Sequence, residues 1–337
     1  MMSLEARLQK KIETTGPLSV ADFMAVALYD PQDGYYTTRI PIGGKGDYIT
    51  APEMTQVFGE VIAGWLINAW HQAGAPTPFH LVEIGPGRGT LMADILRTMQ
   101  SLKIPLSEMT VHLVELSPLL KDIQKTTLSI YTPSISWHED LSTLPHTHGF
   151  CLMVANEFWD ALPIRQQVKI NNEWVERYVS VENNELLFLP KESTIVREVC
   201  PTMPEWVSKI ATHLKKSKGA ALFLDYGYNQ PNAIGDTLQA LQNHQRQFPL
   251  VNVGQSDLTH HVDFFRLSSL FKEAGLIVQE PIPQGDFLTA LGLEMRTEYL
   301  CKIAKSETRG LLRTAAIRLT HPTQMGALFK VLTVTSN

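Results

Sequence analysis

The chain has 337 residues, of which 44% are hydrophobic and 19% are charged, a composition typical of a soluble globular protein. A formal net charge of -5 argues against general electrostatic binding to nucleic acid, because such binding needs a basic face. The three cysteines have neither CxxC spacing nor nearby histidines, so we expect reduced thiols and no metal site. No window contains the roughly 18 apolar residues that a membrane-spanning helix needs.

The first 30 residues have a helical pattern. Apolar residues at positions 4, 8 and 12 fall on one helix face, and Ser19 with Asp22 forms a capping-box arrangement before a second apolar run. The N-terminus lacks secretory or transit-like character, so we expect a cytoplasmic protein. The glycine- and proline-rich stretch 37–53 predicts an ordered loop, and a long loop of this kind is usually functional. A helix over 54–74 is expected to follow it.

From residue 79 onwards, short apolar strands alternate with helical segments. The strands are expected within 79–85, 110–116, 134–141 and 150–158, and this alternation is typical of a parallel sheet with helices on both faces. The alternation stops over 165–190, where Asn-Asn pairs predict the turns of antiparallel strands, and we interpret this part as an insertion. The remaining expected elements are a helix at 204–216, a strand at 219–228, a loop-rich stretch at 229–258, a helix at 264–275 and a last strand at 328–335.

A glycine-rich turn follows the first of these strands. Gly85, Pro86, Gly87, Arg88 and Gly89 separate the strand from the predicted helix, and Glu83 lies two residues before the first glycine. In doubly wound sheets, ligands bind at the carboxyl ends of the strands, where glycines let a ligand approach the backbone closely. A tight turn without a ligand is the structural alternative.

Two classes of ligand compete for this turn. Nicotinamide cofactors favour G-x-G-x-x-G/A, in which a helix N-terminus meets a pyrophosphate. Glu83 would repel a pyrophosphate, whereas it suits the ammonium of S-adenosylmethionine, which also has a ribose and no phosphate. The E-x-G-x-G-x-G pattern therefore favours a methyl donor, and a nicotinamide-dependent dehydrogenase is the weaker alternative.

The second and third strands also end in acidic residues. Glu115, followed by Leu116, lies where a carboxylate accepts hydrogen bonds from both ribose hydroxyls in such sheets. Asp140, followed by Leu141, is a candidate contact for the adenine. For both acids, an ordinary solvated charge at a strand end is the alternative, since most Asp and Glu side chains are exposed.

Several long motifs, in order along nearly the whole chain, resemble the MidA family of class I methyltransferases. They include GYYTTRIPIGGKGDYITAPEMTQVFGEVIAGWL, LVEIGPGRGTLMADILR, HLVELSP, ANEFWDALPIRQ, LFLDYGY, DLTHHVDF, PQGDFLTALGL and MGALFKVL. The resemblance implies an α/β fold with a Rossmann-like, seven-stranded, mostly parallel sheet, S-adenosylmethionine as donor and S-adenosylhomocysteine as product. It also implies a protein acceptor, because the mitochondrial members assist assembly of respiratory complex I and symmetrically N-methylate an arginine of one subunit.

The resemblance further implies a division of the chain and a set of site residues. We expect an N-terminal helical and loop region over 1–78 that covers the active site, and a methyltransferase domain over 79–337 with an insertion at about 166–215. A homodimer is one candidate assembly. The donor-binding residues that we expect are Glu83, Gly85, Pro86, Gly87, Gly89, Glu115, Leu116, Asp140, Leu141 and Asn156. The chain departs from the family pattern near Gln239 and Gln242 and at His260, which leaves the acceptor open.

Methyl transfer is an in-line displacement, so catalysis depends mainly on positioning and electrostatics. An arginine acceptor would need carboxylates to hold its guanidinium, and Glu157, after the fourth strand, is the first candidate, with Asn156 beside it. Asp47 and Glu53 are candidates for a second carboxylate, although loop acids often bond only to the backbone. His261 is a candidate proton carrier, with capping or packing as its alternative.

Two other functions are compatible with these motifs. One is a class I methyltransferase that acts on another protein side chain or on a small molecule. The other is an assembly protein that binds the donor without turnover. Glu83, the glycine turn and Glu157 favour catalysis, whereas the changed residues near Gln239 leave the assembly role open.

Overall fold

The computed structural model describes residues 2–40, 43, 46–145, 149–191 and 195–336. The chain forms two compact units. We call residues 49–158, 206–229 and 264–337 the sheet unit, and residues 1–48, 159–205 and 230–263 the insertion unit. The ranges expected from the sequence, 1–78 and 79–337 with an insertion at about 166–215, divide the chain at other points.

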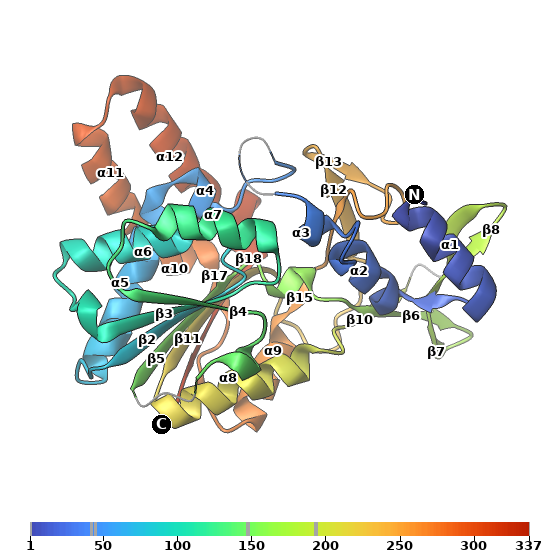
Figure 1. Cartoon of the computed structure of the whole chain (residues 1–337), viewed down its shortest axis with the longest axis horizontal. Coiled ribbons are helices and arrows are strands. Elements are labelled where there is room, and N and C mark those ends of the chain that lie inside the picture. The colour runs from blue at the N-terminus through green and yellow to red at the C-terminus, as the bar shows by residue number, and fades with distance from the viewer. Residues whose placement is uncertain (1, 41–42, 44–45, 146–148, 192–194, 337) are drawn as a thin grey trace. The chain divides into compact units, whose positions relative to one another are not determined.

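The sheet unit is built on a central sheet whose main path has the order β16-β18-β11-β5-β2-β3-β4 (Figure 1). The five strands from β11 to β4 along this order are parallel, whereas β18 runs antiparallel to both β11 and β16. This confirms the predicted seven-stranded, mostly parallel sheet. The bounds are β2 Phe79–Ile84, β3 Met109–Val114, β4 Ser134–His138, β5 Phe150–Asn156, β11 Ala220–Tyr228, β16 Ile277–Val278 and β18 Phe329–Thr335.

Figure 1 shows helices α6 and α7 on one face of this sheet and α8 and α9 on the other, as the alternating pattern predicted. Strands β2 and β5 are buried along their whole length, because helices cover both faces. The helices that belong wholly or mostly to this unit are α4 Ala51–Met54, α5 Gln56–Gln72, α6 Thr90–Ser101, α7 Pro118–Leu128, α8 Met203–Ser217, α9 Phe264–Glu273, α10 Gln284–Ala290, α11 Leu293–Ile303 and α12 Ser306–Thr320. None of the helices among the described residues is long and apolar enough to span a bilayer.

Helices α5 and α6 pack closely against each other and against the sheet. A Cβ atom on Gly59 of α5 would lie 2.4 Å from the Cβ of Asp94 on α6, so only glycine permits this approach. The shared core of these helices and the sheet includes Phe58, Leu81 and Leu152, all completely buried. The position of α6, and therefore of the turn that precedes it, is fixed by this packing.

A row of three histidines crosses one part of the sheet. Nδ1 of His80 on β2 lies 3.1 Å from Nε2 of His112 on β3, whose Nδ1 lies 3.0 Å from Nε2 of His138 on β4. Each of these hydrogen bonds uses one ring proton, so both can form when all three imidazoles are neutral. Burial, then the neighbouring His80 and His138, lowers the pKa of His112 to about 4.

The insertion unit contains three small antiparallel sheets, β1-β8-β9, β10-β6-β7 and β13-β12-β14. The Asn-Asn pairs 171–172 and 183–184 all have positive φ, which confirms the predicted turns of the β6–β7 and β8–β9 hairpins. The expected loop-rich stretch 229–258 contains a further hairpin, β12–β13. The strand bounds are β1 Leu18–Ser19, β6 Arg165–Ile170, β7 Glu173–Glu176, β8 Tyr178–Glu182, β9 Glu185–Leu189, β10 Val196–Val199, β12 Gln239–Gln242, β13 Gln245–Gln247, β14 Asp257–Thr259 and β15 Val262–Asp263.

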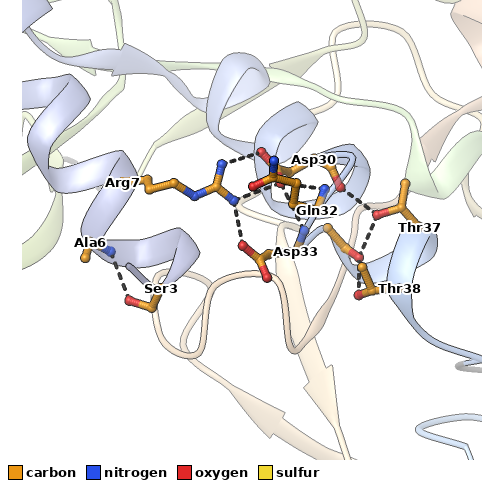
Figure 2. Close-up of polar contacts among 9 residues, drawn as sticks. Ser3, Ala6, Arg7, Asp30, Gln32, Asp33, Thr37 and Thr38 are labelled. Atoms are coloured by element: carbon orange, nitrogen blue, oxygen red, sulfur yellow. Dashed lines mark hydrogen bonds and ion pairs between the residues drawn. The ribbon is translucent and has the colours of Figure 1, made fainter. Parts of the chain in front are cut away.

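Three helices begin this unit: α1 Leu4–Thr15, α2 Val20–Tyr29 and α3 Tyr35–Thr38. Ser19 caps α2 as predicted, because its Oγ accepts a hydrogen bond from the N–H of Asp22. Figure 2 shows Arg7 of α1 bound to both carboxylate oxygens of Asp30 and to Asp33, with nitrogen–oxygen distances of 2.7 to 3.1 Å. These contacts hold the turn between α2 and α3 against α1. The stretch 37–53, predicted as a loop, begins within α3 and ends within α4, and its residues 41–42 and 44–45 lie outside the described residues.

Candidate functional site

The glycine turn lies between the end of β2 and the start of α6. Gly85, Gly87 and Gly89 have φ values of 68°, 51° and 80°, all in the left-handed region that side chains rarely adopt. A Cβ on Gly85 would also lie 3.2 Å from Cδ2 of Phe158. The N–H of Gly89 donates to the carbonyl of Pro86 at 2.8 Å, which closes the turn. The backbone conformation itself therefore favours glycine at each of these positions, whatever the turn binds.

Glu83, on β2 just before this turn, is a buried acid with an unused oxygen. It is 2% exposed, and its Oε2 has no hydrogen-bond partner among the described residues. Burial, and secondarily the nearby Glu115, raises the pKa of Glu83 to about 8. An unpaired buried carboxyl is costly, and a cationic group beside it would restore both the charge and the missing hydrogen bond. The site is therefore suited to a ligand that brings a positive charge.

Glu115 follows β3 and is held from two sides. Its Oε1 accepts a hydrogen bond from the N–H of Ser117 at 2.8 Å, and its Oε2 accepts one from Nε2 of Gln124 at 3.2 Å. Burial, opposed by these hydrogen bonds, raises the pKa of Glu115. The same Nε2 of Gln124 donates to the carbonyl of Gly87 at 2.7 Å, so one side chain links Glu115 to the glycine turn. Leu116, also expected at the donor, is 52% exposed.

Asp140 follows β4 and already has a structural role. Its Oδ1 accepts a hydrogen bond from the N–H of Ser142 at 2.8 Å, and its Oδ2 accepts one from Nζ of Lys209 at 2.8 Å. Burial opposes ionisation, but the bonds to Lys209 and Ser142 outweigh it and lower the pKa of Asp140. Leu141 is fully buried, and its carbonyl lies 2.9 Å from Nε2 of His213. Both carboxylate oxygens of Asp140 are thus engaged within the protein, so an adenine contact from its side chain would have to share them.

Glu157, directly after β5, has a left-handed backbone with φ of 52°. Such a conformation costs a residue with a side chain free energy and is often found at functional sites. The N–H of Glu157 donates to the carbonyl of Leu224 on β11 at 2.9 Å. Its Oε1 accepts a hydrogen bond from Nδ2 of Asn156 at 3.1 Å and a long one from the N–H of Ala51 at 3.4 Å. Oδ1 of Asn156 is buried and has no partner among the described residues.

Asp225 on β11 fixes the residue that follows Glu157. It is completely buried, its Oδ2 accepts a hydrogen bond from the N–H of Phe158 at 3.1 Å, and its Oδ1 accepts one from the N–H of Tyr226. Sequence reasoning did not include Asp225 or Gln124 in the site. The available signal was a polar residue at a buried position: Asp225 interrupts an apolar strand, and Gln124 lies on the buried stripe of α7 with Leu120 and Leu128.

The two acids expected from the 37–53 segment lie in different units. Glu53 on α4 accepts a hydrogen bond from Oγ1 of Thr90, the first residue of α6, and so lies beside the glycine turn. Asp47 belongs to the insertion unit, where its carboxylate accepts hydrogen bonds from the hydroxyl of Tyr35 and the N–H of Asn243, both at 2.7 Å. Asp47 thus anchors the β12–β13 turn. A catalytic role for either acid stays a prediction.

His261 and His260 also belong to the insertion unit. The N–H of His261 donates to Oγ1 of Thr237 at 2.9 Å, and its role as a proton carrier stays a prediction. His260 is 2% exposed, with its ring nitrogens 3.1 and 3.0 Å from the carbonyls of His261 and Leu162. Burial lowers the pKa of His260 to about 4, so it is a neutral packing residue at physiological pH.

The departures from the family pattern near residue 240 lie on one hairpin. Gln239 is paired with Thr259 in the β12–β14 ladder. Oε1 of Gln242 accepts hydrogen bonds from Nε2 of Gln247 at 2.9 Å and from Nδ2 of Asn252 at 3.1 Å. Gln242 therefore stabilises its own hairpin.

Known proteins resemble the chain over nearly its whole length. A model for a family of S-adenosyl-L-methionine-dependent methyltransferases matches residues 61–196 and 187–282. The protein arginine methyltransferase NDUFAF7 homolog of Drosophila melanogaster is 33% identical, with 98% of this chain and 84% of that protein aligned. The human mitochondrial protein arginine methyltransferase NDUFAF7 is 34% identical, with 96% and 81% aligned.

A solved structure shares the fold. The crystal structure of a COG1565 superfamily member from Burkholderia thailandensis bound to S-adenosyl-homocysteine has a TM-score of 0.84 to this chain. The two chains are 26% identical, and the match covers 98% of this chain and 91% of that one. A native structure from the same organism has a TM-score of 0.82 at the same identity. The sheet and the attached insertion therefore occur together in a protein that has been solved with the demethylated donor.

Proposed function

The chain belongs to this family of S-adenosyl-L-methionine-dependent methyltransferases, and on that premise we propose that it methylates an arginine side chain of a protein. The Drosophila and human relatives are named protein arginine methyltransferases, and the alignment covers most of their length. The observation that carries the proposal is a pair of buried acceptor atoms at the ends of β2 and β5, Oε2 of Glu83 and Oδ1 of Asn156, which have no partner among the described residues. Both belong to the sheet unit. Glu83 is the second-last residue of β2 and Asn156 is the last residue of β5, so both lie at carboxyl ends of strands, where ligands bind in such sheets.

The donor half of the site would use the first of these atoms. We assign the ammonium of the methionine moiety to Glu83, because a cation there would pair with the unused Oε2. Gly85, Gly87 and Gly89 would let the donor approach the backbone, and Glu115 would accept hydrogen bonds from the ribose hydroxyls. Bound S-adenosylmethionine supplies an electrophilic methyl group, whose carbon–sulfur bond breaks as the carbon–nitrogen bond forms.

The acceptor half would use Glu157 and Asn156. A guanidinium has five N–H donors and no acceptor, so it needs oxygen atoms to orient it. The Glu157 carboxylate and the unused Oδ1 of Asn156 can accept such N–H groups and aim one nitrogen at the methyl group. The carboxylate would also stabilise the cation until the methylated nitrogen loses its proton. His261 is proposed as a carrier of that proton.

Finer features follow from the family resemblance. We propose a subunit of a complex I-type respiratory enzyme as acceptor, a cytoplasmic location and a homodimeric assembly. A class I methyltransferase that acts on another side chain or on a small molecule is the alternative within the family. An assembly protein that binds the donor without turnover is the alternative outside catalysis. The unused Oδ1 of Asn156 favours turnover, because a scaffold that binds only the donor would gain nothing from leaving this acceptor-side atom unpaired.

Two measurements test the proposal in sequence. Calorimetric titration with S-adenosylmethionine, with NADH as control ligand, should give binding of the sulfonium compound alone. Labelled donor should then transfer methyl to arginine in lysate proteins, and mass spectrometry would locate the modified residue. Glu157→Gln should keep donor binding and lose transfer, because the amide keeps the shape but lacks the charge. Label on lysine or on a metabolite would replace the arginine assignment, and donor binding without any transfer would favour the scaffold.

A further inference from the structure

Gln124 lies where three parts of the donor region meet. Its side chain is completely buried on α7, and all three of its polar contacts reach other elements. Nε2 donates to the carbonyl of Gly87 at 2.7 Å and to Oε2 of Glu115 at 3.2 Å. Oε1 accepts a hydrogen bond from Nε1 of Trp137 on β4 at 2.9 Å. One amide thus connects the glycine turn, the end of β3 and the body of β4.

Trp137 determines which way this amide faces. An indole N–H can only donate, so the atom of Gln124 that it meets must be the oxygen. The two N–H groups of Nε2 are then directed at the two remaining acceptors, Gly87 and Glu115. Because an amide is planar and rigid, the carbonyl of the turn and the carboxylate are held at one fixed separation. Cγ of Gln124 also lies 3.5 Å from where a Cβ on Gly89 would be, so the helix packs directly under the turn.

We propose that Gln124 is a positioning residue that couples the glycine turn to Glu115, so that the donor's ribose is recognised through both together. The inference rests on the proposed donor assignment. Each oxygen of Glu115 accepts one N–H from the protein, from Ser117 and from Gln124, and keeps a lone pair for a ribose hydroxyl. Without Gln124, the Glu115 carboxylate and the Gly87 carbonyl each lose the hydrogen bond that Nε2 donates to them. The turn and the ribose acid then move independently.

The first test is Gln124→Met, which keeps the shape of the side chain and removes its hydrogen bonds. Gln284→Met is the matched control, because Gln284 is equally buried in the same unit but donates to Leu319 on α12, away from the strand ends that hold the donor. Calorimetry would compare S-adenosylhomocysteine with its 2′-deoxyribose analogue. We expect affinity for S-adenosylhomocysteine to fall on the order of 10- to 100-fold, as when a buried partner is left unsatisfied. The preference for ribose over 2′-deoxyribose should shrink, and the control should change neither quantity.

The second test is Gln124→Glu, read as a pH profile of donor affinity. The ionisable groups near this position are Glu115, Glu83 and Lys121. At neutral pH the new carboxylate would repel Glu115 and weaken binding. As the pH falls, the protonated carboxyl becomes a donor again, so affinity should recover relative to wild type. Gln124→Met has no such group and should follow the wild-type profile. A general loss of folding could not produce this difference.

Several results would overturn the inference. Wild-type affinity in Gln124→Met, an unchanged ribose preference, or an equal loss in Gln284→Met would each show that Gln124 does not position the donor site. The same conclusion would follow if the ratio of donor affinities of Gln124→Glu and wild type did not change with pH. Failure of the wild-type protein itself to bind S-adenosylhomocysteine would instead refute the donor assignment. Thermal unfolding of each variant would confirm that the protein compared is folded.

Discussion

The left-handed backbone of Glu157 costs folding free energy, and we expect its side chain to be needed for activity. A residue with a side chain pays about 1–2 kcal/mol to adopt positive φ, whereas glycine does not. Glu157→Gly removes that strain, loses about 0.5–1 kcal/mol to the greater freedom of the unfolded chain, and loses two hydrogen bonds to Oε1. The contact with the N–H of Ala51 is 3.4 Å long and contributes little. Losing the hydrogen bond from Asn156 costs about another 0.5–1.5 kcal/mol, so the net change in unfolding free energy should lie within about 1 kcal/mol of zero.

Lys103 is the matched control for this change. It has φ of 59°, close to the 52° of Glu157, and it is exposed between α6 and the next strand. Lys103→Gly should raise the unfolding midpoint by about 1–3 °C and leave methyl transfer unchanged. Glu157→Gly should be about as stable as wild type, yet lose transfer while retaining donor binding.

Thermal unfolding, donor calorimetry and a labelled-methyl assay on both variants decide the question. If Glu157→Gly were clearly less stable than wild type while Lys103→Gly was more stable, the Glu157 side chain would be a structural element and the strain argument would be wrong. If Glu157→Gly kept its transfer rate, Glu157 would have no part in the chemistry. The two outcomes are independent, because one is measured on folding and the other on turnover.

Three further predictions concern the sheet unit. Gly87→Val should abolish donor binding, since φ of 51° and close approach both require glycine, whereas Gly64→Ala on α5, where a Cβ meets nothing within 4 Å, should bind normally in the same calorimetry. Glu83, with a pKa of about 8, is largely protonated at pH 7 without the donor, so binding a cation should release up to one proton, measurable as a dependence of binding heat on buffer ionisation enthalpy; zero release would contradict the pairing. The pKa of His112 is about 4 in the folded protein and about 6.5 in the unfolded chain, so the unfolded chain takes up a proton first as the pH falls. The free energy of unfolding should therefore decrease between about pH 6.5 and pH 4. His112→Asn should make the free energy of unfolding less dependent on pH in this range.

Much of the fold was predictable because its signals are local. The mainly apolar runs of β2 and β5 indicate strands that are buried on both faces, and both are fully buried. The Asn-Asn pairs at 171–172 and 183–184 need positive φ only at those positions, which identifies two hairpins without any knowledge of their surroundings. The glycine turn was recognised for the same reason. In each case a backbone requirement of one short segment determines which residues can occupy it.

The remainder of the site was not predictable because it depends on partners that are far apart in the sequence. Asp225 acts on the N–H of Phe158, 67 residues earlier, and Gln124 acts on Gly87, 37 residues earlier. The segment 37–53 shows the same limit from the other side. Its acids were candidates on the strength of the family resemblance, and their contacts differ: Glu53 contacts Thr90, while Asp47 contacts Tyr35 and Asn243. A motif specifies which residues are present, and the contacts between elements decide what each one does.

The acidic residues near the strand ends differ in protonation and in hydrogen bonding because their surroundings differ. Asp140 is kept ionised by Lys209 and is used to hold a turn. Asp225 uses both oxygens on backbone N–H groups and so fixes its neighbours. Glu83 has burial without a partner, which raises its pKa and leaves an oxygen for a ligand. Of these three acids, Glu83 is the one with an oxygen that no described protein group uses, so it is the one that we propose for the cationic group of the donor.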